Sequence, residues 1–352
     1  MDKIKWGIIG CGVIGPWHAD SVVDSEYAEL VAACDIDEAR GRAFAGRYGG
    51  AHGGVAFYQD YRQLLRQGGV EAVSICTPSG LHAEMAIAAA QVGVHVLCEK
   101  PMAITVPQLD AMMEAVDKAG VKLEVIFQRR TYEVSRRVRQ AVQSGLLGQL
   151  VLADAYLKYY RSPAYYRSAD WRATWALDGG GALMNQGVHG IDLLLWMVGD
   201  VSSVYARAEA KVRDIEVEDT AVALLTFQNG AYGVIEGTTS CNPGESTAFY
   251  IHGERGTIVL TDEGIARWAV AEDKSTVAEN DPAQCVAHAG PSAVSDPQAV
   301  GRAGHLAQVN DLCLAIVEDR EPMVTGTSAR KAVELILAIY ESARTGKEVW
   351  LV

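Results

Sequence analysis

The chain has 352 residues, of which 49% are hydrophobic and 21% are charged, and its formal net charge is −13. This composition is typical of a folded protein with two domains, and its acidic balance argues against a nucleic-acid partner or an anionic membrane surface. No apolar run approaches the ~20 residues of a membrane span. The seven cysteines are scattered and form no CxxC pair, so we expect reduced thiols, a cytoplasmic location and no metal site.

The first expected strand, Ile4–Gly10, leads into the glycine pattern GxGxxG at residues 10–15. The first glycine suits a tight turn, the second lets a pyrophosphate approach the backbone, and the third lets the next helix pack on the strand. That helix directs its free N–H groups and positive dipole end at phosphates. The residues expected to contact the cofactor are Gly10, Gly12, Val13, Ile14 and Gly15.

A carboxylate follows the second expected strand, Glu29–Cys34, at the position where a dinucleotide fold binds the adenosine ribose. Asp35 lies twenty residues after Gly15 and can accept hydrogen bonds from the ribose hydroxyls. Because a carboxylate repels a 2′-phosphate and Ile36 supplies no positive charge, the sequence favours NAD over NADP as cofactor. Asp35 could instead cap the next helix, although the nearby Asp37 can fill that role.

Strands and helices alternate through the first 127 residues, which predicts a doubly wound parallel sheet in an α/β dinucleotide-binding (Rossmann) domain, residues 1–127. The further strands are expected at Val55–Tyr58, Ala72–Thr77, His95–Glu99 and Lys122–Phe127. The helices between them are expected at Glu38–Tyr48, Asp60–Arg66, Leu81–Val92 and Thr105–Lys118.

Two segments at the carboxyl ends of these strands carry candidate site residues. Thr77, Pro78 and His82 belong to a loop that would border the cofactor, although His82 could equally be an ordinary residue at a helix start. The strand His95–Cys98 ends in Glu99-Lys100-Pro101, and the proline restricts Lys100 to an extended conformation. A Glu-Lys pair is more commonly a solvated pair in a turn. The functional interpretation of this segment therefore depends on the motifs around it.

Residues 128–352 are expected to form a second, α+β domain with a large, mostly antiparallel, open-faced sheet. Several of its strands are apolar on both faces, which predicts a homodimer or homotetramer built through the open face. Residues 272–304 are expected to be irregular. The last two helices, His305–Asp319 and Ser328–Arg344, are expected to pack back toward the first domain. The expected strands are Leu150–Tyr160, Val201–Lys211, Asp219–Phe227, Ala231–Ser240, Ala248–His252, Thr257–Thr261 and Glu348–Val352.

Three glycines, residues 179–181, precede an expected helix at Ala182–Val198. Asn185, His189 and Asp192 are spaced i, i+4 and i+7 on that helix, so they are expected to share one stripe of its surface. A lone histidine on such a stripe is usually a core residue whose hydrogen bonds are satisfied. Three polar groups in register after a glycine triplet favour a functional site instead.

The chain resembles the Gfo/Idh/MocA family, which includes glucose–fructose oxidoreductase and inositol dehydrogenases. The matching pieces are the N-terminal GxGxxG, the Glu99-Lys100-Pro101 motif and the stretch from Gly179 to Asp192. The resemblance implies that Lys100 and His189 line the substrate site. Many members have aspartate four residues before the histidine, whereas this chain has Asn185, which cannot take a proton from a hydroxyl.

The segment 163–175, which contains Trp171 and Arg172, is similar to the family branch that oxidises the 3-hydroxyl of UDP-N-acetylaminoglucuronate. This similarity implies that both residues belong to the substrate site. Without it they would be interpreted as a packed loop aromatic and a solvated arginine. Many members of unknown substrate share the feature, so the substrate class stays a sugar, polyol or sugar nucleotide.

These features together predict NAD-dependent oxidation of a secondary hydroxyl on a sugar, cyclitol or sugar derivative. Lys100 is the expected base, with its pKa lowered by burial and by the positive nicotinamide, and Glu99 holds the local geometry and contacts the cofactor. His189 binds the reacting oxygen or accepts the proton, and Asp192 orients His189. Two alternatives are an NAD(H)-binding redox sensor without turnover and an enzyme that uses NAD transiently to process a glycoside.

Overall fold

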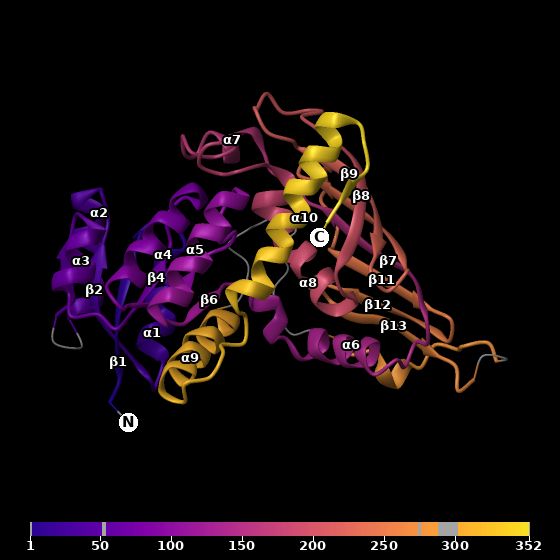
Figure 1. Cartoon of the computed structure of the whole chain (residues 1–352), viewed down its shortest axis with the longest axis horizontal. Helices are drawn as coiled ribbons and strands as arrows, with labels where there is room; N and C mark the ends of the chain where they lie inside the picture. The colour runs from indigo at the N-terminus through magenta and orange to yellow at the C-terminus, as the bar shows by residue number, and fades with distance from the viewer. Residues whose placement is uncertain (1, 51–53, 274–275, 288–301, 352) are drawn as a thin grey trace. The chain divides into compact units, whose positions relative to one another are not determined.

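The computed structural model consists of two compact units (Figure 1). One unit is made of Met1–Gln128 with Arg302–Arg330, and the other of Arg129–Gly301 with Lys331–Val352. The segment 302–330, which the sequence analysis counted with residues 128–352 but expected to pack toward the first domain, belongs to the first unit. The residues that the structure describes are 2–50, 54–273, 276–287 and 302–351.

The first unit contains a six-stranded sheet in the order β3-β2-β1-β4-β5-β6, and every pair in it is parallel. The predicted doubly wound Rossmann sheet is thus confirmed. The central strands β4 and β5 are almost wholly buried, as expected for strands covered by helices on both faces. The strands are β1 Ile4–Ile9, β2 Ala28–Cys34, β3 Ala56–Tyr58, β4 Ala72–Ile75, β5 His95–Cys98 and β6 Leu123–Val125.

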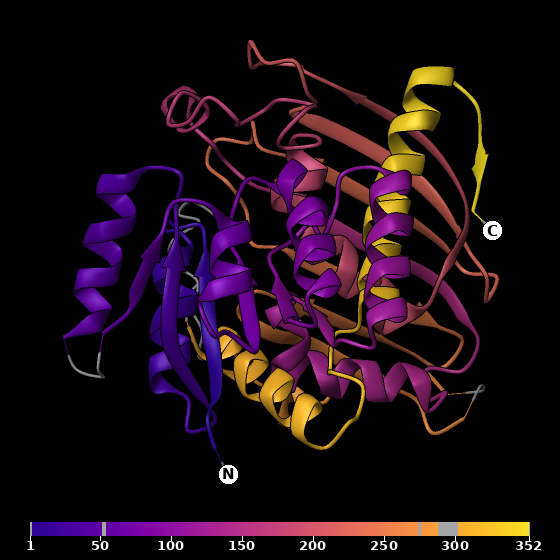
Figure 2. The ribbon, with the colours of Figure 1, turned by 60° about the vertical axis from the view of Figure 1, so that its left-hand side comes forward.

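In the part of the chain that the structure describes, six α-helices accompany this sheet, and five of them lie between its strands in the sequence. The sixth, α9, comes from the far end of the chain and packs against α1, beside which it lies in Figures 1 and 2. Gln308 on α9 donates hydrogen bonds to Glu124 Oε1 at 2.9 Å and to the Val125 carbonyl at 2.8 Å. The helices are α1 Gly15–Asp24, α2 Glu38–Gly49, α3 Tyr61–Gln67, α4 His82–Gln91, α5 Val106–Ala119 and α9 Ala303–Val317, with short 3₁₀ turns at Ser79–Leu81 and Gln128–Thr131.

The second unit contains an eight-stranded sheet in the order β13-β12-β11-β7-β10-β9-β8-β14, antiparallel except for the pair β10 and β7. This confirms the predicted mostly antiparallel sheet. The strand β13 was not predicted, because Gly264–Val270 is apolar apart from Arg267 and lacks the alternation that marks a half-buried strand. The strands are β7 Leu150–Lys158, β8 Val201–Glu209, β9 Thr220–Phe227, β10 Tyr232–Thr238, β11 Ala248–Gly253, β12 Gly256–Thr261, β13 Gly264–Val270 and β14 Val349–Trp350.

Helices α6 and α8 pack against each other and cover one face of this sheet (Figure 1). Part of the segment 272–304, predicted to be irregular, lies outside the described residues, and its last two residues begin α9. None of the helices that the structure describes is both long and apolar enough to cross a bilayer. The helices are α6 Glu133–Gln143, α7 Pro163–Tyr166, α8 Val188–Val198 and α10 Gly326–Thr345, with a 3₁₀ turn at Pro282–Gln284.

The predicted continuous α-helix at Ala182–Val198 is wrong in its first half. Residues Ala182–Gly187 form a π-helix, labelled η3, and only Val188–Val198 is the α-helix α8. A Cβ on Gly187 would lie 2.9 Å from the Ala182 carbonyl oxygen, so the missing side chain allows the wider turn. The i, i+4, i+7 stripe therefore does not describe how Asn185 is placed relative to the residues of α8.

The other face of the second sheet carries exposed apolar side chains. Tyr205, Leu224 and Val234 are paired across β8, β9 and β10, and Tyr205 and Leu224 are 40% and 54% exposed. Val222 and Tyr232 extend the patch and are 48% and 58% exposed. Each lies between buried neighbours along its strand, so the strand pattern puts apolar residues on both faces.

Candidate functional site

The glycine-rich loop of the first unit has one open position and two crowded ones. A Cβ on Gly10, whose φ is 100°, would lie 2.6 Å from the Cys76 carbonyl oxygen. A Cβ on Gly15 would lie 2.3 Å from the Gly10 carbonyl oxygen, whereas one on Gly12 would meet nothing within 4 Å. Gly10 and Gly15 are thus required by the turn and by helix packing, and Gly12 leaves open space where a pyrophosphate can approach.

Asp35 follows β2 and is buried at the start of the loop before α2. Its carboxylate accepts hydrogen bonds from the Cys11 and Asp37 N–H groups, both at 2.9 Å, and from the Arg40 guanidinium. Burial raises the pKa of Asp35, but these donors outweigh burial and hold the pKa below its usual value. Asp37 caps α2 through Arg40 N–H, as the sequence allowed. Arg40 itself was not predicted as a site residue.

Glu99, directly after β5, is held by two histidines from distant segments. His18 Nε2 lies 2.9 Å from Glu99 Oε1, and His305 Nε2 lies 3.5 Å from the same oxygen. The Lys100 N–H donates to the other oxygen at 3.1 Å. Burial raises the pKa of Glu99, but the two imidazoles outweigh it and hold the pKa well below its usual range. The backbone of Lys100 is therefore tied to a fixed buried anion.

The three side chains His18, Glu99 and His305, which we call the Glu99 cluster, bring three possible metal ligands together. The sequence shows no metal-ligand spacing, yet one ligand atom from each of these residues lies within 4.8 Å of the others. A metal-binding histidine usually donates its second ring nitrogen to an acceptor. Nδ1 of His18 and both ring nitrogens of His305 are buried without a hydrogen-bond partner, so His305 Nε2 only lies close to the carboxylate. We therefore interpret the cluster as a carboxylate held by imidazoles.

His82 connects the two loops that follow β4 and β5. Its Nε2 lies 2.8 Å from the Thr77 carbonyl oxygen, and its Nδ1 lies 2.8 Å from the Pro101 carbonyl oxygen. Burial lowers the pKa of His82, while the two carbonyls favour the protonated ring. Both ring nitrogens of His82, which was predicted to border the cofactor, therefore lie within hydrogen-bonding distance of backbone carbonyls. The contact with Pro101 fixes the segment that carries Lys100.

In the second unit, Asn185 is held by a buried carboxylate that the sequence analysis missed. Asn185 Nδ2 donates to Asp178 Oδ1 at 2.6 Å, and Asp178 Oδ2 accepts from the Ala173 N–H at 2.8 Å. Asp178 immediately precedes the glycine triplet, and this position beside the motif could have marked it as a site residue. The pair fixes the orientation of the amide at the position where many family members carry aspartate.

At two of the three glycines the backbone lies close to other residues of the second unit. A Cβ on Gly180 would lie 2.2 Å from the Tyr340 hydroxyl oxygen, and one on Gly181 would lie 1.9 Å from the Glu218 carbonyl oxygen. The Glu218 carboxylate accepts from the Gly181 N–H at 2.9 Å, the Leu183 N–H at 2.8 Å and the Tyr340 hydroxyl at 2.8 Å. Burial raises the pKa of Glu218 to about 7.

Asp192 on α8 is paired with an arginine that was also not predicted. Arg130 Nε and Nη2 donate to its two carboxylate oxygens at 2.8 and 2.5 Å, and both side chains are buried. Burial raises the pKa of Asp192, and Arg130 opposes that shift. His189 is half-buried one turn earlier on the same helix. The expected role of Asp192 in orienting His189 stays a prediction.

Trp171 and Arg172 pack against the residues that precede α8. The Arg172 guanidinium lies 4.7 Å from the Trp171 ring centroid, and its Nη1 donates to the Tyr165 hydroxyl at 2.8 Å. Gln186 Nε2 donates to the same hydroxyl at 2.9 Å. Arg172 is thus linked through Tyr165 to the π-helix that carries Asn185, and the role of Trp171 and Arg172 in substrate binding stays a prediction.

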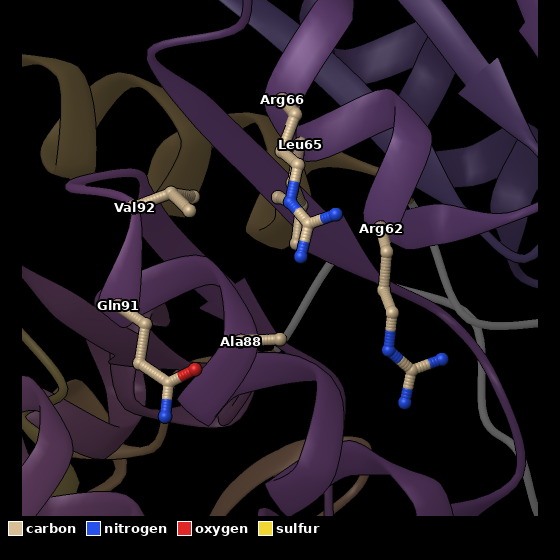
Figure 3. Close-up of a pocket in the computed structure, with 6 residues that line it drawn as sticks. All are labelled: Arg62, Leu65, Arg66, Ala88, Gln91 and Val92. Carbon is tan, nitrogen blue, oxygen red and sulfur yellow. The ribbon is translucent and has the colours of Figure 1, made fainter.

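A small pocket in the first unit lies apart from these groups. It encloses about 90 Å³ between α3 and α4 (Figure 3). Its Arg62 pairs with Glu84 at 2.6 Å, and none of the predicted catalytic or cofactor-binding residues lines it. We assign it no role in the chemistry. The lining residues are Arg62, Leu65, Arg66, Ala88, Gln91 and Val92.

Two family models match the chain. Residues 4–127 match the oxidoreductase family with an NAD-binding Rossmann fold, and residues 135–259 match the GFO/IDH/MocA C-terminal domain. Myo-inositol 2-dehydrogenase of Thermotoga maritima is 30% identical over 278 residues, which are 74% of this chain and 79% of that protein. The uncharacterized oxidoreductase YrbE of Bacillus subtilis is 30% identical over 260 residues, 72% and 73% of the two chains.

The WlbA dehydrogenase from Bordetella pertussis, solved in complex with NADH and UDP-GlcNAcA, is a similar structure. Its TM-score is 0.87 at 33% identity, and the match covers 100% of this chain and 99% of that one. The first unit is therefore an NAD-binding domain, which agrees with the open position at Gly12 and the carboxylate at Asp35.

The contrast between Gly15 and Gly12 gives a test of the loop. Gly15→Ala should lower the free energy of unfolding by about 2 kcal/mol or more, because its Cβ overlaps a backbone carbonyl. Gly12→Ala should change stability by less than about 0.5 kcal/mol. It should nevertheless weaken NADH binding about tenfold, since the new methyl group occupies the open approach. Urea denaturation and NADH fluorescence titration measure the two effects, and equal destabilisation by both variants would contradict this assignment.

Glu218 predicts a specific pH dependence of stability. Its folded pKa of about 7 lies above its usual value of 4.5, so the folded state binds the extra proton between these values. The stabilisation that Glu218 contributes to the folded state is fully present below the unfolded pKa, and it is lost as pH rises through about 7. Relative to Glu218→Gln, the wild type should gain about 2 kcal/mol between pH 8 and pH 5.5. Parallel stability curves in denaturant titrations would show that Glu218 does not titrate in this window.

Proposed function

Because the chain belongs to the Gfo/Idh/MocA family of NAD-binding oxidoreductases, we propose that it oxidises a secondary hydroxyl of a sugar, cyclitol or sugar derivative to a ketone. The observation that carries this proposal is Lys100, whose backbone is fixed by the Glu99 cluster at the carboxyl end of β5. Ligands of doubly wound sheets bind at such strand ends. Bound NAD supplies the acceptor for the hydride that leaves the substrate carbon.

The residues of this chain supply binding and proton transfer. The loop from Gly10 to Gly15 and Asp35 hold the dinucleotide, and Lys100 Nζ, in its neutral form, takes the proton of the reacting hydroxyl. Asn185, with Nδ2 on Asp178, can bind a hydroxyl but cannot accept its proton. His189 is the second candidate for the proton acceptor, and Trp171 with Arg172 contribute to substrate binding.

The two candidate bases are tested by separate variants. Lys100→Met keeps the length of the side chain and removes the acceptor, so kcat should fall by about 10²–10⁴-fold. His189→Ala should cost less if His189 only binds the oxygen, and as much or more if it is the base. NADH affinity should stay nearly unchanged in both variants. The matched control is Lys118→Met, on an exposed position of α5, which should keep full activity.

Assays with purified protein would decide both the base and the activity. NADH formation should be measured with a panel of polyols, free sugars and UDP-linked uronates, the last group chosen for the WlbA-like structure. Near-normal kcat for Lys100→Met at saturating substrate would refute its role as base. NADH binding without turnover on any of these substrates would favour the redox sensor, and product formation without net NADH would favour transient use of NAD.

We also infer that the exposed apolar patch of the second sheet, Tyr205, Val222, Leu224, Tyr232 and Val234, is covered by a second copy of the chain. Exposed apolar side chains aligned across several strands are typical of subunit interfaces. A homodimer or homotetramer through this face would remove them from water. The patch lies on the face opposite to the one that α6 and α8 cover.

Leu224→Glu places a charge in the centre of this patch. Association should weaken by about 30-fold or more, because the carboxylate loses water without gaining a partner. Light scattering at micromolar concentration should then report a smaller species than for the wild type. Val92→Glu, at a 45% exposed position of the first unit, is the control and should leave the assembly unchanged. A monomeric wild type would exclude the interface.

A further inference from the structure

Every acceptor position of the Asp35 carboxylate is occupied by a donor of the chain itself. Oδ1 accepts from the Asp37 N–H at 2.9 Å and from Arg40 Nη2 at 2.6 Å. Oδ2 accepts from the Cys11 N–H at 2.9 Å and from Arg40 Nε at 2.8 Å. A carboxylate offers about four lone-pair positions. The ribose hydroxyls expected at this residue therefore meet a carboxylate whose acceptor positions are already filled.

Of these donors, only Arg40 can leave at low cost. The Cys11 and Asp37 N–H groups are backbone groups fixed by the glycine-rich loop and by the start of α2. The Arg40 side chain is 48% exposed, whereas that of Asp35 is 4% exposed. An exposed guanidinium can exchange its hydrogen bonds to Asp35 for hydrogen bonds to water. Because the other donors are fixed, a ribose diol that binds Asp35 must displace Arg40.

We propose that Arg40 is a cofactor-specificity residue that competes with the adenosine ribose of NAD for Asp35 and weakens the exclusion of NADP. A bare carboxylate repels a 2′-phosphate, but a carboxylate paired with a guanidinium presents almost no net charge to it. Once displaced, the guanidinium lies beside the 2′ position and can pair with a phosphate there. Ile36, which is 83% exposed, adds no charge of its own. The proposal rests on the NAD-binding domain and not on the substrate proposed above.

A purely structural role for Arg40 makes a different prediction. Arg40 Nη1 also lies 3.7 Å from Asp37 Oδ2, so the arginine could simply stabilise the first turn of α2. Its removal would then change the stability of the folded protein, but it would affect the affinities for NADH and NADPH by the same factor. The ratio of the two dissociation constants separates the two roles.

The experiment titrates the purified full-length protein with NADH and with NADPH, followed by fluorescence, without any substrate. Arg40→Met keeps the aliphatic stem and removes the charge and the donors. It should tighten NADH binding about threefold to tenfold and weaken NADPH binding by a similar factor, so that the ratio changes at least about tenfold. Arg40→Lys keeps the charge and should retain most of the NADPH binding.

Arg42→Met is the matched control. Arg42 lies on the same helix, pairs with the exposed Glu38 at 2.8 Å, and its loss changes the net charge equally. It should leave the ratio within about twofold of the wild type, as long-range charge effects in salt are small. An unchanged ratio in Arg40→Met, or weaker NADH binding in that variant, would overturn the proposal. Because only dinucleotide binding is measured, neither result bears on the proposed oxidation of a hydroxyl.

Discussion

The buried carboxylate of Glu99 determines how the first unit holds the backbone of Lys100. A buried anion without donors would cost several kcal/mol, so Glu99 requires the imidazoles of His18 and His305 and the N–H of Lys100. These partners come from α1, from α9 and from the strand end itself. The carboxylate thereby joins the glycine-rich helix, the segment 302–330 and the Lys100 loop into one unit, and His82 extends the network to the loop after β4.

The second unit also contains a buried carboxylate, that of Glu218, and its hydrogen-bond donors are of a different kind. Glu218 is as buried as Glu99, but its partners are two backbone N–H groups and a phenol rather than imidazoles. Burial is the largest influence on Glu218, and its hydrogen bonds do not outweigh it, so the pKa moves upward. The pKa of Glu99 moves in the opposite direction. The same side chain is therefore a fixed anion in one unit and a titrating group in the other.

Local patterns predicted most of the fold, because the information that specifies strands, helices and the glycine loop lies within short windows. Asp35 and Lys100 were found in this way, since each follows a buried strand. Distant partners of Glu99 and Asp192 were missed: His305 lies about two hundred residues from Glu99, and Arg130 lies 62 positions from Asp192. Ion pairs at such separations leave no periodic signal. The π-helix at Ala182–Gly187 was missed because helical periodicity assumes 3.6 residues per turn.

The missed residues are of one physical kind, and this explains their importance. Arg40, Arg130, Asp178 and His305 each pair with a buried or half-buried group that a sequence pattern had already marked. A marked side chain has a defined geometry only when its remaining hydrogen-bonding capacity is filled, so its partners decide which of its atoms stay available for a ligand. For Asn185 the Asp178 carboxylate takes the amide nitrogen. For Asp35 the Arg40 guanidinium takes one acceptor position on each oxygen, so a ligand that approaches this carboxylate meets the pair rather than the carboxylate alone.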